Sequence, residues 1–90
     1  MKTPEETYRR LQNKGYRFRE EDDRYTIVVK PVENYSYIEK AIAIKKIDGR
    51  AISLGAKINT YLTTGDEAII LVEAMNGAYN DALEVNHLCS

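Results

Sequence analysis

The residues best suited to chemistry lie at the C-terminal end of the chain. His87 and Cys89 are separated by one residue, and they are the only histidine and the only cysteine in the sequence. Imidazole and thiolate groups both bind zinc, but a zinc site takes three or four protein ligands. The sequence holds no further His or Cys to complete one. We therefore expect no metal site and no internal disulfide, and we interpret these residues as a frayed terminus.

Patterns for nucleophilic catalysis and phosphate binding are also lacking. Ser53 has no histidine partner except His87, so the sequence predicts no hydrolytic triad. The glycines do not cluster ahead of a lysine and a helix, as a phosphate-binding loop requires. A helix start near Gly65 offers backbone N–H groups to an anion, but Asp66 and Glu67 would repel one. We expect no catalytic residues, no cofactor and no enzymatic activity.

The acidic run Glu20-Glu21-Asp22-Asp23 is a candidate for binding a divalent cation. Consecutive carboxylates lack the spaced ligands and the glycine of a calcium-binding loop. Runs of like charge are usually exposed to solvent. We interpret this run as a solvated turn between two strands.

Charge is divided unevenly along the chain, although the net charge is only −1. All 13 Lys and Arg residues lie between Lys2 and Lys57, together with nine acids, whereas residues 58–90 carry five acids and no base. Such asymmetry suggests a charged partner. The alternative is internal complementarity, in which an acidic C-terminal helix packs beside basic elements of the same chain.

The first half of the chain predicts a helix and then a hairpin. Thr3 caps a helix that has Pro4 in its first turn and Glu6 in a capping box, and Gly15 ends it. Residues 16–19 alternate apolar and basic side chains, as a half-buried strand does. Residues 25–30 are β-branched and aromatic, which also favours a strand.

Residues 37–47 fit two structures. Read as a helix, they place Tyr37, Ile38, Ala41, Ile42 and Lys45 along one side. Asp48-Gly49 favours a strand instead, because this dipeptide between apolar runs is typical of a tight hairpin turn. Residues 50–58 then return with a regular apolar alternation. We predict two paired strands here.

The C-terminal segment predicts a long helix. Thr64 and Glu67 form a capping box, and the apolar residues that follow recur at spacings of three and four. The expected sheet-facing stripe comprises Ala68, Leu71, Val72, Met75, Ala78, Tyr79, Ala82 and Leu83. Gly77 interrupts the pattern, which indicates a kink or a close contact with the sheet.

The expected fold is therefore a single α+β domain over residues 1–90. It consists of a four-stranded antiparallel meander packed by a long C-terminal helix and a short N-terminal helix, in the order α-β-β-β-β-α. The chain opens with no secretory signal, and no apolar run reaches the roughly 18 residues that a membrane span needs. We expect a cytoplasmic protein with no membrane contact.

Alternation along the strands predicts which side chains face away from the helix. We expect Phe18, Ile27, Val29, Ile42, Ile44, Ile52 and Leu54 to point to the helix. The opposite face then has a flat centre of small residues (Ala41, Ala43, Ala51, Ser53 and Gly55). Its basic rim comprises Arg17, Arg19, Lys30, Lys45 and Lys57, which we predict to bind a partner.

Further binding residues are expected at the margins of this sheet. Tyr35, Tyr37 and Tyr61 lie in or beside loops, where they can stack on bases or anchor a protein. A second candidate surface is the acidic side of the C-terminal helix, with Glu73, Asp81 and Glu84.

These features indicate binding rather than catalysis. The first hypothesis is a small non-enzymatic protein-interaction module that acts as an inhibitor, adaptor or regulator by binding a partner protein. The alternative is a single-stranded nucleic-acid-binding domain that uses the basic face of the sheet. A third hypothesis is a homodimer that forms through the flat sheet face.

Overall fold

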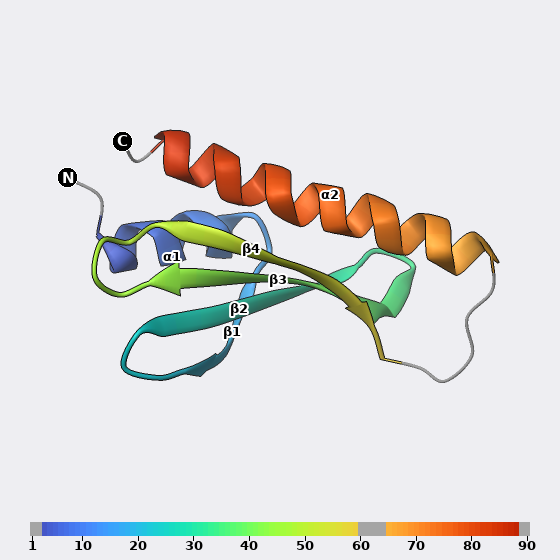
Figure 1. The fold of residues 1–90 in the computed structure, drawn as a ribbon, viewed down its shortest axis with the longest axis horizontal. Coiled ribbons are helices and arrows are strands. Elements are labelled where there is room, and N and C mark those ends of the chain that lie inside the picture. The colour runs from blue at the N-terminus through green and yellow to red at the C-terminus, as the bar shows by residue number, and fades with distance from the viewer. Residues whose placement is uncertain (1–2, 60–64, 89–90) are drawn as a thin grey trace.

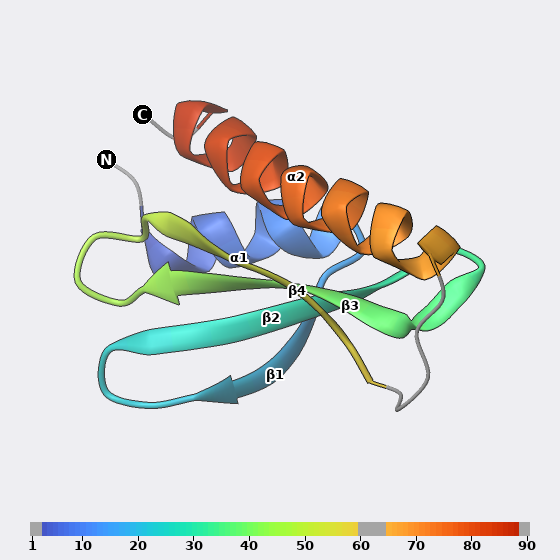
Figure 2. The ribbon, with the colours of Figure 1, turned by 45° about the vertical axis from the view of Figure 1, so that its right-hand side comes forward.

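The computed structural model describes residues 3–59 and 65–88 and has the expected α-β-β-β-β-α order. The elements are α1 (Pro4–Asn13), β1 (Arg17–Glu21), β2 (Tyr25–Val32), β3 (Tyr35–Lys45), β4 (Ala51–Ile58) and α2 (Gly65–Leu88). The strands form one antiparallel sheet in the order β1-β2-β3-β4. Figures 1 and 2 show both helices on the same side of this sheet. Within the described residues, the second face of the sheet has no helix over it.

Helix α1 begins and ends as its sequence predicts. The Thr3 side chain accepts a hydrogen bond of 3.1 Å from the Glu6 backbone N–H, and Pro4 occupies the first turn. Gly15 follows the helix with a φ of +99°, a conformation that glycine adopts without steric cost. Thr7 and Leu11 are buried, which fixes the side of α1 that packs on the rest of the molecule.

The hairpin of β1 and β2 differs from the expected one in length. Glu20 and Glu21 belong to β1, opposite Ile27 and Thr26, so they do not form part of the turn. Both acids are tolerated because every residue of β1 is exposed at the edge of the sheet. The turn is made by Asp22. Its carboxylate accepts hydrogen bonds from the backbone N–H groups of Arg24 and Tyr25, at 2.8 and 2.9 Å.

Residues 37–47 are mostly strand, as Asp48-Gly49 suggests, but the turn that follows is longer than a two-residue hairpin. Strand β3 ends at Lys45 and β4 begins at Ala51. Gly49 has a φ of +73°, and a Cβ there would lie 2.6 Å from the backbone carbon of Thr3. The Thr7 hydroxyl also donates a hydrogen bond to the Gly49 carbonyl. The turn is longer because it docks against the start of α1.

The expected sheet faces are reversed in β2 and in the first half of β4, as far as the bulge before Gly55. Val28, and not Ile27 or Val29, points toward α2: it is 1% exposed and lies opposite the buried Ile42. In β4, Ile52 lies opposite Ala43 on the face away from α2, whereas the buried Ala51 lies opposite Ile44. Residues directly opposite each other in an antiparallel pair share a face. Phe18 is on the helix side as expected, but it is half-exposed.

Helix α2 buries only part of the expected stripe. Ala78 and Ala82 are buried as expected, together with Ala74 and Val85. Val72, Met75, Tyr79 and Leu83, which were expected to face the sheet, are all about half-exposed. The reason is that small side chains allow α2 to lie close to the sheet, mainly over β4 and less over β3. The helix runs without interruption through Gly77, which lies close to the Lys40 side chain.

The core lies between α1, the C-terminal half of α2 and the middle of the sheet. Its buried residues are Leu11, Tyr16, Val28, Ile42, Ile44, Ala51, Ala82 and Val85. The Asn86 side chain joins α2 to the start of β4: its amide donates to the Ala51 carbonyl and its oxygen accepts from the Ala51 N–H, both at 2.8 Å. This pair satisfies backbone groups at the edge of the sheet, as a neighbouring strand would.

Candidate protein-interaction surface

The sheet face that points away from both helices has an apolar centre. We call this the open face. Ile27 and Val29 of β2 are partly exposed on it, beside Ala41 of β3. On β4, Ile52 is 38% exposed and Leu54 is 54% exposed. Leu54 lines a shallow hollow together with Ile27, Val29 and Ala41. This hollow has a volume of about 240 Å³ and also reaches Arg19, Glu39 and Lys57. The centre is therefore aliphatic rather than the small, flat surface that the sequence predicts.

Charged side chains surround this centre. The Arg19 guanidinium binds both carboxylate oxygens of Glu39, at 2.7 and 2.8 Å. The Asn59 side chain donates a third hydrogen bond to Glu39 at 3.2 Å. Partial burial acts to raise the pKa of Glu39, but the hydrogen bonds and the charge of Arg19 outweigh it and hold the pKa below its usual value. Glu39 is thus ionised at neutral pH, and the rim carries both signs of charge.

The structure places four of the five predicted basic residues on the open face. Arg17 lies opposite Val29, and Lys57 lies opposite Glu39. Lys45 lies at the end of β3 and forms an ion pair of 3.8 Å with Asp48. The prediction is wrong for Lys30, which lies opposite Lys40 on the helix side of the sheet.

The side chain of Lys30 explains its position. Its Nζ donates a hydrogen bond of 2.6 Å to the Lys14 carbonyl, at the C-terminal end of α1. A lysine is favourable there because it satisfies a carbonyl that the helix leaves without a partner. Lys30 shares a face with Val28, which the sequence had assigned to the wrong side of the sheet.

Two of the three predicted tyrosines, Tyr35 and Tyr37, lie at the start of β3. The rings of Tyr35 and Tyr37 pack edge to face, with centroids 6.2 Å apart. Partial burial, and then the nearby Glu67 carboxylate, raise the pKa of Tyr37. Tyr37 therefore interacts with the first turn of α2, and Tyr61 lies outside the described residues.

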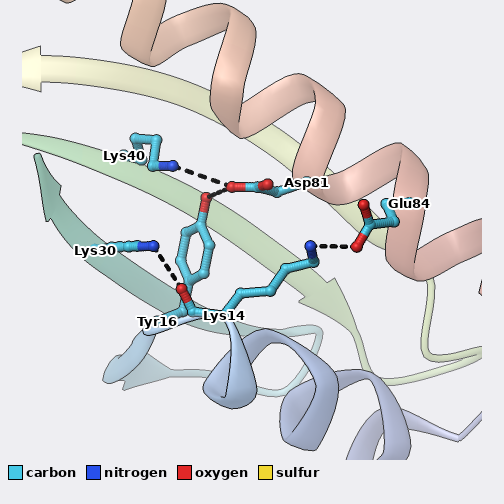
Figure 3. Close-up of polar contacts among 6 residues, drawn as sticks. All are labelled: Lys14, Tyr16, Lys30, Lys40, Asp81 and Glu84. Atoms are coloured by element: carbon cyan, nitrogen blue, oxygen red, sulfur yellow. Dashed lines mark hydrogen bonds and ion pairs between the residues drawn. The ribbon is translucent and has the colours of Figure 1, made fainter.

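The predicted acidic surface on α2 is largely paired within the chain. Tyr16 donates a hydrogen bond of 2.7 Å to Asp81, and the Lys40 Nζ donates another of 3.1 Å to the same oxygen. Figure 3 shows this group together with the ion pair between Lys14 and Glu84. Basic residues from the first half of the chain thus pair with acids of α2. This is the alternative explanation of the uneven charge distribution, in which the acidic helix packs beside basic elements of the same chain.

This pairing shifts two pKa values in opposite directions. Burial acts to raise the pKa of Asp81, but the hydrogen bonds from Tyr16 and Lys40 and the lysine charges hold it below its usual value. Burial, followed by the hydrogen bond to Asp81 and then the negative charge of Asp81, raises the pKa of Tyr16. The pair is therefore held as carboxylate and neutral phenol over a wide range of pH.

A second apolar surface was not identified from the sequence. Helix α2 carries Ile69, Val72, Met75, Tyr79 and Leu83, which are between 45% and 59% exposed. We call these five residues the outer row. The Cβ position at Gly55 lies 3.9 Å from the Cγ of Met75, so the row lies on the β4 side of α2. A signal was present, because apolar residues surround more of α2 than one sheet contact can cover.

The described residues contain no group of three or more His, Cys, Asp or Glu side chains that could hold a metal ion. A hollow between α1 and the first hairpin is lined by Tyr8, Phe18 and Thr26, with the 2.7 Å ion pair of Glu21 and Lys46 beside it. Its lining residues include no His, Cys or Ser. Cys89 lies outside the described residues.

None of the helices in the described part of the chain combines the length and the apolar character needed to span a bilayer. No protein-family model, no curated protein and no solved structure matches this chain. The surfaces therefore have to be interpreted from their own chemistry.

Proposed function

We propose that this chain is a small non-enzymatic protein-interaction module, which acts as an inhibitor, adaptor or regulator by binding a partner protein on the open face. The observation that carries the proposal is the group of aliphatic side chains on this face, with Leu54 54% exposed. Protein interfaces typically have an apolar centre and a polar, charged rim. The open face has this arrangement, with Arg17, Arg19, Glu39 and Lys57 around the centre.

Binding of single-stranded nucleic acid is the second candidate. Such surfaces combine a basic groove with aromatic side chains on which bases stack. The centre of the open face is aliphatic, and Glu20 and Glu39 place negative charge at its rim. Arg19 is already bound to Glu39 through two hydrogen bonds. These features favour a protein partner over a phosphate backbone.

Two matched variants test the proposal. Leu54→Asp places a charge at the centre of the open face, whereas Ile47→Asp changes an 87% exposed residue in the loop between β3 and β4. We expect partner proteins isolated with the wild-type chain from its source cells to be lost with Leu54→Asp and retained with Ile47→Asp. Isothermal titration with the purified partner should show at least about a 30-fold weaker affinity for Leu54→Asp, or roughly 2 kcal/mol.

The same variants separate the two candidate functions. A partner bound equally by wild type and Leu54→Asp would remove the open face from the proposal. Tight, salt-dependent binding of a labelled oligothymidylate, lost when Arg17 and Lys57 are changed to alanine, would support the nucleic-acid candidate instead.

A further inference from the structure

The two flanks of α2 differ in what they contact. On one flank, Asp81 and Glu84 pair with Lys40 and Lys14, and Glu73 borders a hollow shared with Lys30 and Lys40. The outer row lies on the other flank, beside β4. At 3.6 residues per turn, the five residues of the row fall within an arc of about 120°. They form a continuous apolar strip about 21 Å long at 1.5 Å per residue.

The two edges of the sheet differ in the same way. β1 has the sequence Arg-Phe-Arg-Glu-Glu and is exposed along its length, so its charges oppose pairing with another strand. β4 has the sequence Ala-Ile-Ser-Leu-Gly-Ala-Lys-Ile, with Lys57 as its single charge. Asn86 covers the backbone of this edge at Ala51. The apolar edge strand and the apolar flank of α2 therefore lie on the same side of the molecule, where Figure 2 shows α2 running over β4.

We propose that the outer row binds a second copy of this chain, with the two α2 helices packed antiparallel across a two-fold axis. Packed helices lie about 8–10 Å apart. Because α2 lies mainly over β4, an axis beside the β4 edge brings the two helices together. The two sheets then lie with their β4 edges toward each other and with both helices on the same side, and Asn86 keeps these edges from pairing at Ala51.

The chemistry of the row favours a second copy over a different partner. A two-fold interface brings each patch onto its own image, so a charged patch would meet its own sign. The outer row carries no charge, and the nearest acids of α2 lie on the opposite flank. A basic partner would gain nothing from those acids, because Asp81 and Glu84 are paired within the chain.

The row is also nearly symmetric about its own midpoint. Ile69 and Leu83 lie equally far from Asn76, and Val72 and Tyr79 lie at similar distances on either side. In an antiparallel pair of helices, Ile69 of each copy consequently lies near Leu83 of the other, and Val72 of each copy lies near Tyr79 of the other. The two helix dipoles are then opposed, which is favourable.

Sedimentation equilibrium of the full chain tests this inference. We expect the wild-type protein to have twice the monomer mass of 10.3 kDa at micromolar concentration. Val72→Asp and Leu83→Asp should each weaken the dimer by at least about 100-fold, because each buries two unpaired carboxylates per interface. Circular dichroism checks that the variants remain folded. Ile47→Asp, which changes an 87% exposed isoleucine in the loop between β3 and β4, is the matched control and should stay dimeric.

The outcomes distinguish this inference from the proposed function, because the two use different surfaces. A wild-type chain that stays monomeric up to about 1 mM, and so has a dissociation constant above that concentration, would overturn the dimer and leave the open face untouched. A dimer that is lost with Leu54→Asp but kept with both row variants would move the contact to the open face, which also overturns the inference.

A cysteine pair tests the antiparallel arrangement. In a Cys89→Ser background, we expect Asn76→Cys to oxidise to a covalent dimer, because the two copies of this residue lie at the midpoint. Asn80→Cys should remain reduced, since its two copies are about 12 Å apart along the axis and a disulfide needs Cα atoms within about 7 Å. Equal cross-linking of both variants, or cross-linking of Asn80→Cys alone, would contradict the antiparallel register.

Discussion

The sheet-facing side of α2 and its outer row are built from residues of opposite size. The sheet-facing side is mostly alanine, with Ala74, Ala78 and Ala82 buried. The outer row holds the large apolar residues, which are half-exposed. A helix that served only to cover its own sheet would have the larger residues inside. The difference indicates that the inner side of α2 is selected for close approach to the sheet, and that the outer row is available for an interaction.

The largest expected effect comes from adjacent residues on the two sides. Ala82 is 4% exposed and Leu83 is 50% exposed. We expect Ala82→Asp to lower the free energy of unfolding by about 3–5 kcal/mol, because it buries an unpaired carboxylate. Leu83→Asp should lower it by no more than about 0.5 kcal/mol at a concentration too dilute for self-association. Urea unfolding of both variants measures the contrast, and equal losses would contradict it.

Changes in side-chain volume should also affect stability differently on the two sides of α2. Ala78 is fully buried, so Ala78→Leu forces α2 away from the sheet and should cost about 1–3 kcal/mol. Met75→Ala should cost less than about 0.5 kcal/mol, because Met75 is 45% exposed. The sequence placed Met75 in the middle of the buried stripe, so a loss of 2 kcal/mol or more for Met75→Ala would restore that interpretation.

The paired flank of α2 predicts a defined dependence on pH. The pKa of Asp81 is lower in the folded chain than its ordinary value of 3.8, so its contribution is present at neutral pH. This contribution is lost as the pH falls below about 4 and through the folded pKa. The pKa of Tyr16 is raised, so its contribution is lost as the pH rises above its ordinary value of 10.0.

Two variants isolate this pH dependence. Asp81→Asn should cost about 1–2 kcal/mol at pH 7 and remove the part of the acid-induced loss that Asp81 causes. Glu73→Gln is the control on the same flank and should leave that loss in place. Unfolding measured between pH 3 and pH 7 gives the comparison. An acid-induced loss that is identical in wild type and Asp81→Asn would contradict the role of this pair.

The smallest effect is expected at the rim of the open face. Arg19→Ala and Lys57→Ala should each change the unfolding free energy by less than about 1 kcal/mol, because the charges are exposed to solvent. Both should weaken binding of a partner protein more at low salt than at high salt. A loss of stability larger than the loss of binding would show that the rim serves the fold.

The sequence predicts the strand order because local signals agree with the fold. Thr3 and Pro4 start α1, and Asp48-Gly49 marks the return from β3 to β4. The strand faces were harder to predict, since residues 25–29 are apolar or β-branched at both parities. The structure has β-bulges near Arg19 and Gly55, which shift the alternation along β1 and β4. Alternation from one end of such a strand therefore assigns the wrong face beyond the bulge.

The candidate site was predictable only in part. Arg17, Arg19, Lys45 and Lys57 do share the open face. Lys57 does so because the bulge near Gly55 shifts the alternation that follows Ile52. The aliphatic centre was missed together with the faces of β2 and β4. The outer row was missed because α2 has two adjoining apolar stripes, and periodicity does not show which of them covers the sheet. Only the size of the residues distinguishes them, with alanine on the inner side.

The central claim is that large apolar residues outside the core serve association and not folding of the single chain. The urea midpoint of the wild-type chain, measured across a hundredfold range of protein concentration, tests it most directly. Mass action predicts that the midpoint rises with concentration, and that Leu83→Asp shows one midpoint throughout, equal to that of the dilute wild type. A wild-type midpoint that does not change with concentration would contradict the claim for α2.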